Sequence, residues 1–117
     1  MSGEITAPIA RESDSIIKRT VREDGDYACT KYTVIGQNDL ITFLELKLVT
    51  GRTHQIRVHF SYLGFPLLGD DMYGGDCTFI QRQALHCGRT VFVHPVTNET
   101  LTFSAPLPED IGKLIKY

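Results

Sequence analysis

The sequence predicts an α+β fold: a mixed, mainly antiparallel sheet with one central helix and a C-terminal helix. Two pairs of adjacent segments alternate apolar and polar residues around short turns, which is typical of β-hairpins. One segment between these pairs repeats its apolar residues at helical spacing, and a second helical pattern follows two prolines near the end. The 117 residues suit one modest domain or a part of a larger one.

The first half of the chain contains the clearer of the two hairpins. Residues 1–26 mix charges without periodicity, and we expect a loop with one short strand there. Residues 28–35, ACTKYTVI, are rich in β-branched and aromatic side chains and predict a strand. Residues 36–39 predict a turn, and residues 40–49, LITFLELKLV, predict the second strand.

The spacing of apolar residues changes after residue 49. Ile56, Phe60 and Leu63 stand at i, i+4 and i+7, which predicts a helix of about ten residues. Thr53 is the expected N-cap, and Gly64 is expected to end the helix.

The second half repeats the combination of hairpin and helix. Residues 64–75, GFPLLGDDMYGG, predict a loop that carries a short strand. Residues 84–95 and 99–105 predict a hairpin, and Pro106 and Pro108 introduce an amphipathic helix over residues 109–117, EDIGKLIKY.

Composition excludes several classes of protein. A net charge of −2 and a pI of about 6 argue against wholesale coating of nucleic acid, although a local basic patch remains compatible with it. No apolar run is long enough for a membrane span, and the N-terminus has no secretory signal pattern. Cys29, Cys77 and Cys87 form no CxxC pair, and we expect reduced thiols in a cytoplasmic protein.

Histidines and acids offer candidate sites that the residues alone do not favour. His54 and His59 lie about 140° apart around a helix and cannot both bind one metal ion from one face. We interpret them, with His86 and His94, as hydrogen-bonded structural histidines, and no GxSxG or GxxxxGK[ST] motif occurs. The adjacent Asp70 and Asp71 point opposite ways on an extended chain, and turn capping is the expected role.

Residues 50–59, TGRTHQIRVH, concentrate two arginines and two histidines without an acid. Arg52 and the predicted helix N-terminus suit an anion such as phosphate, but a solvated basic turn explains the pattern equally well. Arg57 falls beside the apolar stripe of the predicted helix. An arginine at the edge of a buried face usually has a partner, so we expect one for Arg57.

Two long stretches closely resemble the C-terminal part of the RluA-type pseudouridine synthases. The family pattern runs TGRxHQxRVH, then GxPxxGDxxYG, then LHA with a following HP and a late APxP. Residues 50–75 and 82–108 match nearly all of this pattern, and the resemblance covers about residues 3–115. Two positions depart from it: Phe65, where the family often has histidine, and Cys87 in place of alanine.

This resemblance implies isomerisation of uridine to pseudouridine in structured RNA, ribosomal or transfer RNA, without a cofactor or metal. Enzymes of the family flip the target uridine out of its stack. An aspartate then attacks, the N-glycosidic bond breaks, and the base is reattached through C5. The resemblance also implies a partial pseudouridine synthase fold.

The family's catalytic aspartate belongs to an upstream motif, HRLDxxTSG, which these residues lack. We therefore expect residues 1–117 to be the C-terminal portion of a catalytic domain, inactive alone and prone to self-association through its uncovered sheet. The alternative is a non-catalytic RNA-binding module or a degenerate paralogue. A metal-dependent hydrolase that uses His54, His59 and Asp70 is a more distant third reading.

The resemblance assigns roles by motif position. Arg57 matches the arginine that pairs with the catalytic aspartate, which would lower the pKa of that carboxyl by roughly 1–3 units and fix its direction. Ile56 and Leu85 are expected in the apolar pocket wall, and Arg52 and His54 are expected to contact phosphate or hold the loop. Because an unpaired buried arginine costs about 3–5 kcal/mol, Arg57 should be exposed here or bind an anion or another carboxylate.

Overall fold

The computed structural model describes residues 2–13, 15, 17–38, 41–93 and 95–115. Strands and short helices alternate along the chain, with the longest strands and the longest helix in the first 62 residues. In chain order the elements are β1 (Ser2–Thr6), β2 (Ile9–Arg11), β3 (Arg19–Val21), β4 (Cys29–Gln37), β5 (Thr42–Leu48), α1 (Gln55–Tyr62), the 3₁₀ helix η1 (Asp71–Tyr73), β6 (Arg89–Val93), β7 (Thr100–Ser104) and α2 (Glu109–Ile115).

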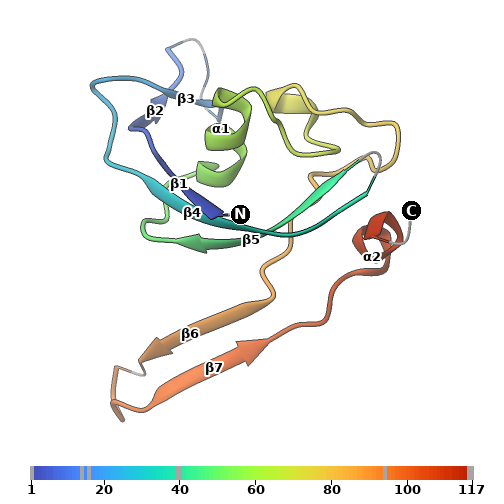
Figure 1. Ribbon diagram of the computed structural model, residues 1–117. Coiled ribbons are helices and arrows are strands. Elements are labelled where there is room, and N and C mark those ends of the chain that lie inside the picture. Colours follow the sequence, from blue (N-terminus) through green and yellow to red (C-terminus); the bar gives the residue numbers. More distant parts are fainter. Residues whose placement is uncertain (1, 14, 16, 39–40, 94, 116–117) are drawn as a thin grey trace.

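A three-stranded antiparallel sheet in the order β1-β4-β5 forms the base of the molecule. β1 pairs with the first half of β4, from Ser2 opposite Thr33 to Thr6 opposite Cys29. β4 and β5 form a hairpin whose register shifts between Val34 and Gly36. Helix α1 lies over one face of this sheet, beside the short β2–β3 pair (Figure 1).

The β6–β7 hairpin extends away from the three-stranded sheet, and the chain then returns to α2 near the β4–β5 turn (Figure 1). One ion pair ties this returning segment to the loop before β6: Arg82 binds Asp110 through two hydrogen bonds of 2.8 and 2.9 Å. No helix among the described residues is long and apolar enough to cross a membrane.

The apolar core is small and lies between α1 and the segments around it. Ile9 of β2, Ala28, Val58 of α1 and Tyr73 of η1 form one buried cluster, against which Val21 of β3 packs. Burial of such side chains contributes roughly 1.5–3 kcal/mol each for a large aliphatic residue. The core therefore holds η1 and β2–β3 against the same helix.

A buried polar network holds α1 on β4. His59 is fully buried; its Nε2 lies 2.9 Å from the carbonyl oxygen of Ala7, and its Nδ1 lies 2.9 Å from the Thr30 hydroxyl. Gln55, one turn earlier, donates from Nε2 to the Thr30 hydroxyl and to the carbonyl oxygen of Cys29, both at 2.9 Å. A carbonyl can only accept, so Nε2 of His59 carries a proton and Nδ1 accepts the proton of Thr30.

The predicted α+β class, both hairpins and both helices are confirmed. β4 continues through Gly36 and Gln37, two residues further than expected, and Asn38 then closes the turn by accepting the Ile41 N–H at 2.9 Å. The ends of the predicted turn and C-terminal helix at residues 39–40 and 116–117 lie outside the described residues.

Two predictions about loops are wrong. The described part of residues 1–26 contains three strands instead of one, because β1 gains its ladder from β4, more than 20 residues away, and local periodicity does not report such pairing. The described residues 64–75 contain η1 and no strand. Gly69 there has φ 76°, a left-handed conformation that interrupts an extended segment and favours glycine.

The predicted start of the helix is also wrong. α1 begins at Gln55, and His54 holds the N-cap position with φ 56°, while Thr53 is exposed. No side chain caps the helix start; the Gln55 Oε1 instead accepts the Arg52 N–H at 2.9 Å and so ties the preceding loop to the helix. Of the predicted stripe, Phe60 is buried, Ile56 is half-buried and Leu63 is exposed.

We predict that His59→Leu destabilises the protein by about 2–4 kcal/mol, because it leaves the Ala7 carbonyl oxygen without a donor and the Thr30 hydroxyl proton without an acceptor in a buried site. Urea unfolding measures the loss. His86→Leu is the matched control, since the Nε2 of His86 also meets a backbone carbonyl, Ala105 at 3.1 Å, but in an exposed position. Equal losses in the two variants would contradict a structural role for the buried network.

Candidate functional site

Arg57 forms a bidentate ion pair with Asp70. Nε donates to Oδ2 at 3.0 Å and Nη2 donates to Oδ1 at 2.9 Å. The Asp70 side chain is 1% exposed and that of Arg57 is 15% exposed. Hydrogen bonding to Asp70 raises the pKa of Arg57, partly offset by its burial, so the guanidinium stays charged. The sequence predicts that Arg57 is exposed or binds an anion or another carboxylate. The last alternative is confirmed, because the carboxylate of Asp70 binds it.

The expected turn-capping role of Asp70 is wrong. Asp70 occupies the N-cap position of η1 but makes no side-chain cap hydrogen bond there, and its carboxylate turns to Arg57 instead. Asp71 is exposed, so the two adjacent acids do point apart. The sequence does not identify this partner, because 13 residues and a loop separate Asp70 from Arg57. The one indication in the sequence is that an arginine beside a buried face needs a partner.

Tyr73 lies at the centre of the site. Its ring faces the Arg57 guanidinium at 5.0 Å and the Lys18 ammonium at 5.9 Å, both within range of a cation–π contact. Its hydroxyl accepts the Arg19 N–H at 3.0 Å and lies 2.7 Å from Nδ1 of His54. Tyr73 therefore joins β3, α1 and η1 at one point.

His54 is held in a left-handed conformation that is uncommon outside glycine. Such backbone conformations persist where surrounding contacts fix them, and here the bond to Tyr73 does so. Burial, then the charges of Arg57 and Arg19, lower the pKa of His54, while Asp70 opposes them. A neutral ring also fits the hydrogen bonds, because it can accept the Tyr73 proton while that oxygen accepts the Arg19 N–H.

The other predicted site residues are less closely connected. Arg52 is exposed, and its Nε donates to the carbonyl oxygen of Tyr27 at 2.8 Å, which directs its guanidinium outward from the loop. Ile56 and Leu85 are both half-buried. Leu85 lies in the loop before β6, where its carbonyl oxygen is 3.4 Å from Nη1 of Arg82.

The histidines keep the structural interpretation where the structure describes them. His59 and His86 bind backbone carbonyls, and His54 binds Tyr73. His94 lies outside the described residues. Within the described part of the chain, no three His, Cys, Asp or Glu side chains gather where they could hold a metal ion.

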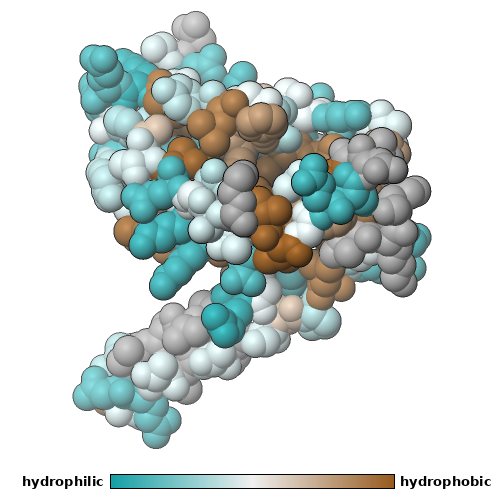
Figure 2. Space-filling view, viewed as in Figure 1, coloured by the Kyte–Doolittle hydropathy of each residue, from teal (hydrophilic) through white to brown (hydrophobic). Residues whose placement is uncertain are grey.

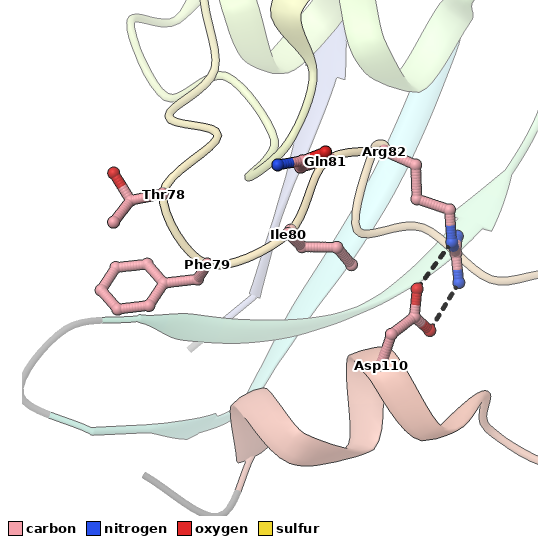
Figure 3. A pocket seen from close by; sticks show the side chains of 6 residues that line it. All are labelled: Thr78, Phe79, Ile80, Gln81, Arg82 and Asp110. Carbon is pink, nitrogen blue, oxygen red and sulfur yellow. Dashed lines mark hydrogen bonds and ion pairs between the residues drawn. The ribbon is translucent and has the colours of Figure 1, made fainter.

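A surface hollow of about 450 Å³ lies apart from the predicted site residues. Figure 3 shows the Arg82 side chain reaching from the loop to Asp110 on α2. The Ile80 side chain lies beside this pair, on the same loop as Arg82. Thr78, Phe79 and Gln81 complete its lining. None of the residues assigned by motif position contributes to this hollow, so it does not mark the Arg57 site.

We predict that His54 titrates below 6.5 and that Arg57→Gln raises its pKa toward that value, since a positive neighbour is removed. NMR titration of the imidazole signals measures both values. Arg82→Gln is the control and should leave His54 unchanged. Because the folded pKa lies below the unfolded one, the stability linked to His54 is complete above about pH 6.5 and declines as pH falls toward the folded value. An unchanged His54 pKa in Arg57→Gln would contradict the geometry.

Comparison with known proteins places the chain in a family. The family model described as RNA pseudouridylate synthase matches residues 1–62. The uncharacterized RNA pseudouridine synthase YjbO of Bacillus subtilis is 56% identical over 116 residues, which cover 99% of this chain and 41% of that protein. Ribosomal large subunit pseudouridine synthase D of Vibrio cholerae is 43% identical over 126 residues, covering 96% and 39%.

A solved structure agrees with these relatives. The human protein called RNA pseudouridylate synthase domain containing 1 superimposes with a TM-score of 0.76 at 28% identity, over 90% of this chain and 48% of that one. This chain thus spans about two fifths of the length of the curated relatives named above. From the family match over more than half of its residues, we conclude that the chain belongs to the RNA pseudouridine synthase family.

Proposed function

We propose that residues 1–117 form the C-terminal portion of a pseudouridine synthase catalytic domain, which converts uridine to pseudouridine in ribosomal or transfer RNA. The catalytic aspartate comes from outside these residues, and the chain alone is inactive. No cofactor or metal takes part in this reaction, and the compartment is the cytoplasm. The names of the relatives support the reaction, and three cysteines present as thiols suit a reducing compartment.

The free edge of the Arg57 guanidinium carries this proposal. Asp70 engages Nε and Nη2, and among the described residues Nη1 has no hydrogen-bond partner. Every fully buried side-chain nitrogen or oxygen of the described residues has a hydrogen-bond partner, and Nη1 has none, so Nη1 is not fully buried. A charged, oriented and mostly buried donor is what a catalytic carboxylate needs to stay ionised and directed.

The remaining site residues have supporting roles. Arg52 presents an exposed guanidinium to the RNA backbone, where it forms phosphate contacts. His54, neutral and fixed by Tyr73, holds the loop before α1. Ile56 and Leu85, half-buried, supply apolar surface for the flipped base.

A non-catalytic RNA-binding module remains the second candidate, and one observation favours it. Asp70 already satisfies Arg57, so the scaffold is complete without a carboxylate from elsewhere. A degenerate paralogue would then keep the basic loop and bind RNA without isomerising uridine.

Grafting residues 1–117 onto the rest of YjbO in place of the matching segment tests the proposal. The readout is tritium release from RNA that carries C5-tritiated uridine, because C5 loses its hydrogen when the base is reattached. We expect no release from the 117-residue chain, and release from the chimera at a rate near that of YjbO. Arg57→Gln should lower kcat by about 10²-fold or more.

Arg52→Gln is the matched arginine control in the same chimera and should raise KM for RNA while leaving kcat unchanged. Activity of the 117-residue chain alone would contradict the need for an outside carboxylate. A chimera that binds RNA but releases no tritium, beside an active YjbO, would favour the non-catalytic module.

We also predict self-association of the 117-residue chain. β1 and β5 are the edge strands of the three-stranded sheet. The apolar residues Ile35 of β4, Leu48 of β5 and the following Val49 are 64%, 46% and 52% exposed. Figure 2 shows hydrophobic surface in the centre of the face across which the β4–β5 hairpin runs. Exposed edges and apolar patches favour pairing between copies. Light scattering should give a mass above the 13.1 kDa of one chain, and a strict monomer at high concentration would contradict this.

A further inference from the structure

Asp70 has the features of a permanent partner of Arg57. Building on the proposed function, we propose that Asp70 is a positioning residue: it holds Nε and Nη2 of Arg57 throughout the reaction and leaves Nη1 to meet the catalytic carboxylate. The alternative is a placeholder, a carboxylate that occupies Arg57 only until the catalytic aspartate arrives and then releases it.

The loop around Asp70 argues against release. Two backbone hydrogen bonds join the ends of this loop. The Gly69 N–H donates to the carbonyl oxygen of Asp76 at 2.8 Å, and the Gly75 N–H donates to the carbonyl oxygen of Asp70 at 2.7 Å. A Cβ at Gly69 would overlap the carbonyl oxygen of Arg82, and one at Gly75 would overlap that of Leu67. The loop is therefore packed backbone against backbone on both sides of Asp70, and the Asp70 side chain is only 1% exposed, so release of Arg57 would leave a buried carboxylate without this partner.

A second contact restrains the guanidinium. The Tyr73 ring lies 5.0 Å from the guanidinium carbon of Arg57, and the Ser61 hydroxyl of α1 donates to the Tyr73 carbonyl oxygen at 2.8 Å. Arg57 is thus held by a carboxylate at one edge and lies over an aromatic ring, and both of these partners are on a loop that α1 itself contacts. Such double support keeps a functional group within the narrow geometry that catalysis needs.

The pair also changes the electrostatics expected for Arg57. The Arg57–Asp70 pair has no net charge, although the guanidinium itself stays charged, so the pair attracts a second carboxylate more weakly than a lone cation would. Directional hydrogen bonding from Nη1 remains in full. Orientation is then the main contribution of Arg57, and Asp70 sets it.

Asp70→Asn in the active chimera separates these alternatives, because asparagine keeps the volume but loses the charge and one acceptor. Asp110→Asn is the matched control: Asp110 makes the same two-bond contact with Arg82, but the two side chains are 46% and 44% exposed. The measurements are kcat, KM for RNA, and the acid limb of the pH profile of kcat/KM.

A positioning role predicts that Asp70→Asn lowers kcat by about 10- to 100-fold, because the guanidinium loses its orientation, with little change in KM. The acid limb should move to lower pH, since a negative charge beside the catalytic carboxylate is gone. The charged and titratable groups at this site, Arg57, Tyr73, His54, Lys18 and Arg19, are unchanged in the variant. Asp110→Asn should alter none of the three quantities.

Other outcomes overturn the proposal. A placeholder predicts an unchanged or higher kcat. A merely structural role predicts that activity falls only with the folded fraction, while the acid limb stays in place. If Asp70→Asn does not fold, Asp70→Glu decides: it keeps the charge and displaces the guanidinium, so kcat should fall with the acid limb unmoved, and an unchanged kcat would refute positioning.

The 117-residue chain gives an independent readout. The Nε–H of Arg57 should exchange slowly with solvent in NMR spectra, faster in Asp70→Asn and unchanged in Asp110→Asn; equal exchange in all three would contradict a lasting contact. An inactive wild-type chimera beside active YjbO counts against the proposed function. An active chimera whose Asp70→Asn variant matches it counts against the positioning role alone.

Discussion

The hydrogen-bond network that fixes α1 on β4 is the contact on which the rest of the site depends. Gln55 and His59 stand one turn apart, so their side chains leave the helix on the same side and both reach Thr30. Each donor and acceptor in this buried set has a partner, which makes its geometry specific. An apolar interface of the same size would permit the helix to slide or rotate, whereas this network permits one orientation.

That orientation determines where Arg57 points. At 100° per residue, Arg57 lies about 200° from Gln55, on the side of the helix opposite the sheet network. This side faces the loop that contains Asp70 and Tyr73, and the core residue Val58 packs against Tyr73 in the same cluster. Two functional consequences follow from one motif: Gln55 and His59 hold the helix on the sheet, and Arg57, placed between them, reaches the loop.

The sequence predicted the elements that depend on local pattern and missed those that depend on distant partners. Alternation found both hairpins, and the helix was found from its apolar spacing, although Gln55 and His59 are more deeply buried than Ile56 or Leu63. The buried face also carries polar residues, which the spacing of apolar residues does not reveal, so the spacing predicted the helix but only part of its buried face. β1 was missed because its ladder comes from β4.

The site shows the same division between local and distant information. The basic motif and the need for a partner of Arg57 were visible in the residues, but the identity of that partner was not. Asp70 looked like a turn residue because aspartate next to glycine usually is one. Its role depends on the backbone packing at Gly69 and Gly75, which brings its carboxylate to a guanidinium 13 residues earlier.

The Arg57–Asp70 pair also reconciles folding with function. A half-buried guanidinium left alone costs about 3–5 kcal/mol, which is a large part of the stability of a small domain. If the catalytic carboxylate were its only partner, the helix and its loop would depend on that carboxylate to be stable. With Asp70 at one edge, this region is satisfied by its own residues, and only Nη1 is left for chemistry. The stabilising contact and the reactive one then use different edges of one side chain, so that the second can form and break without disturbing the first.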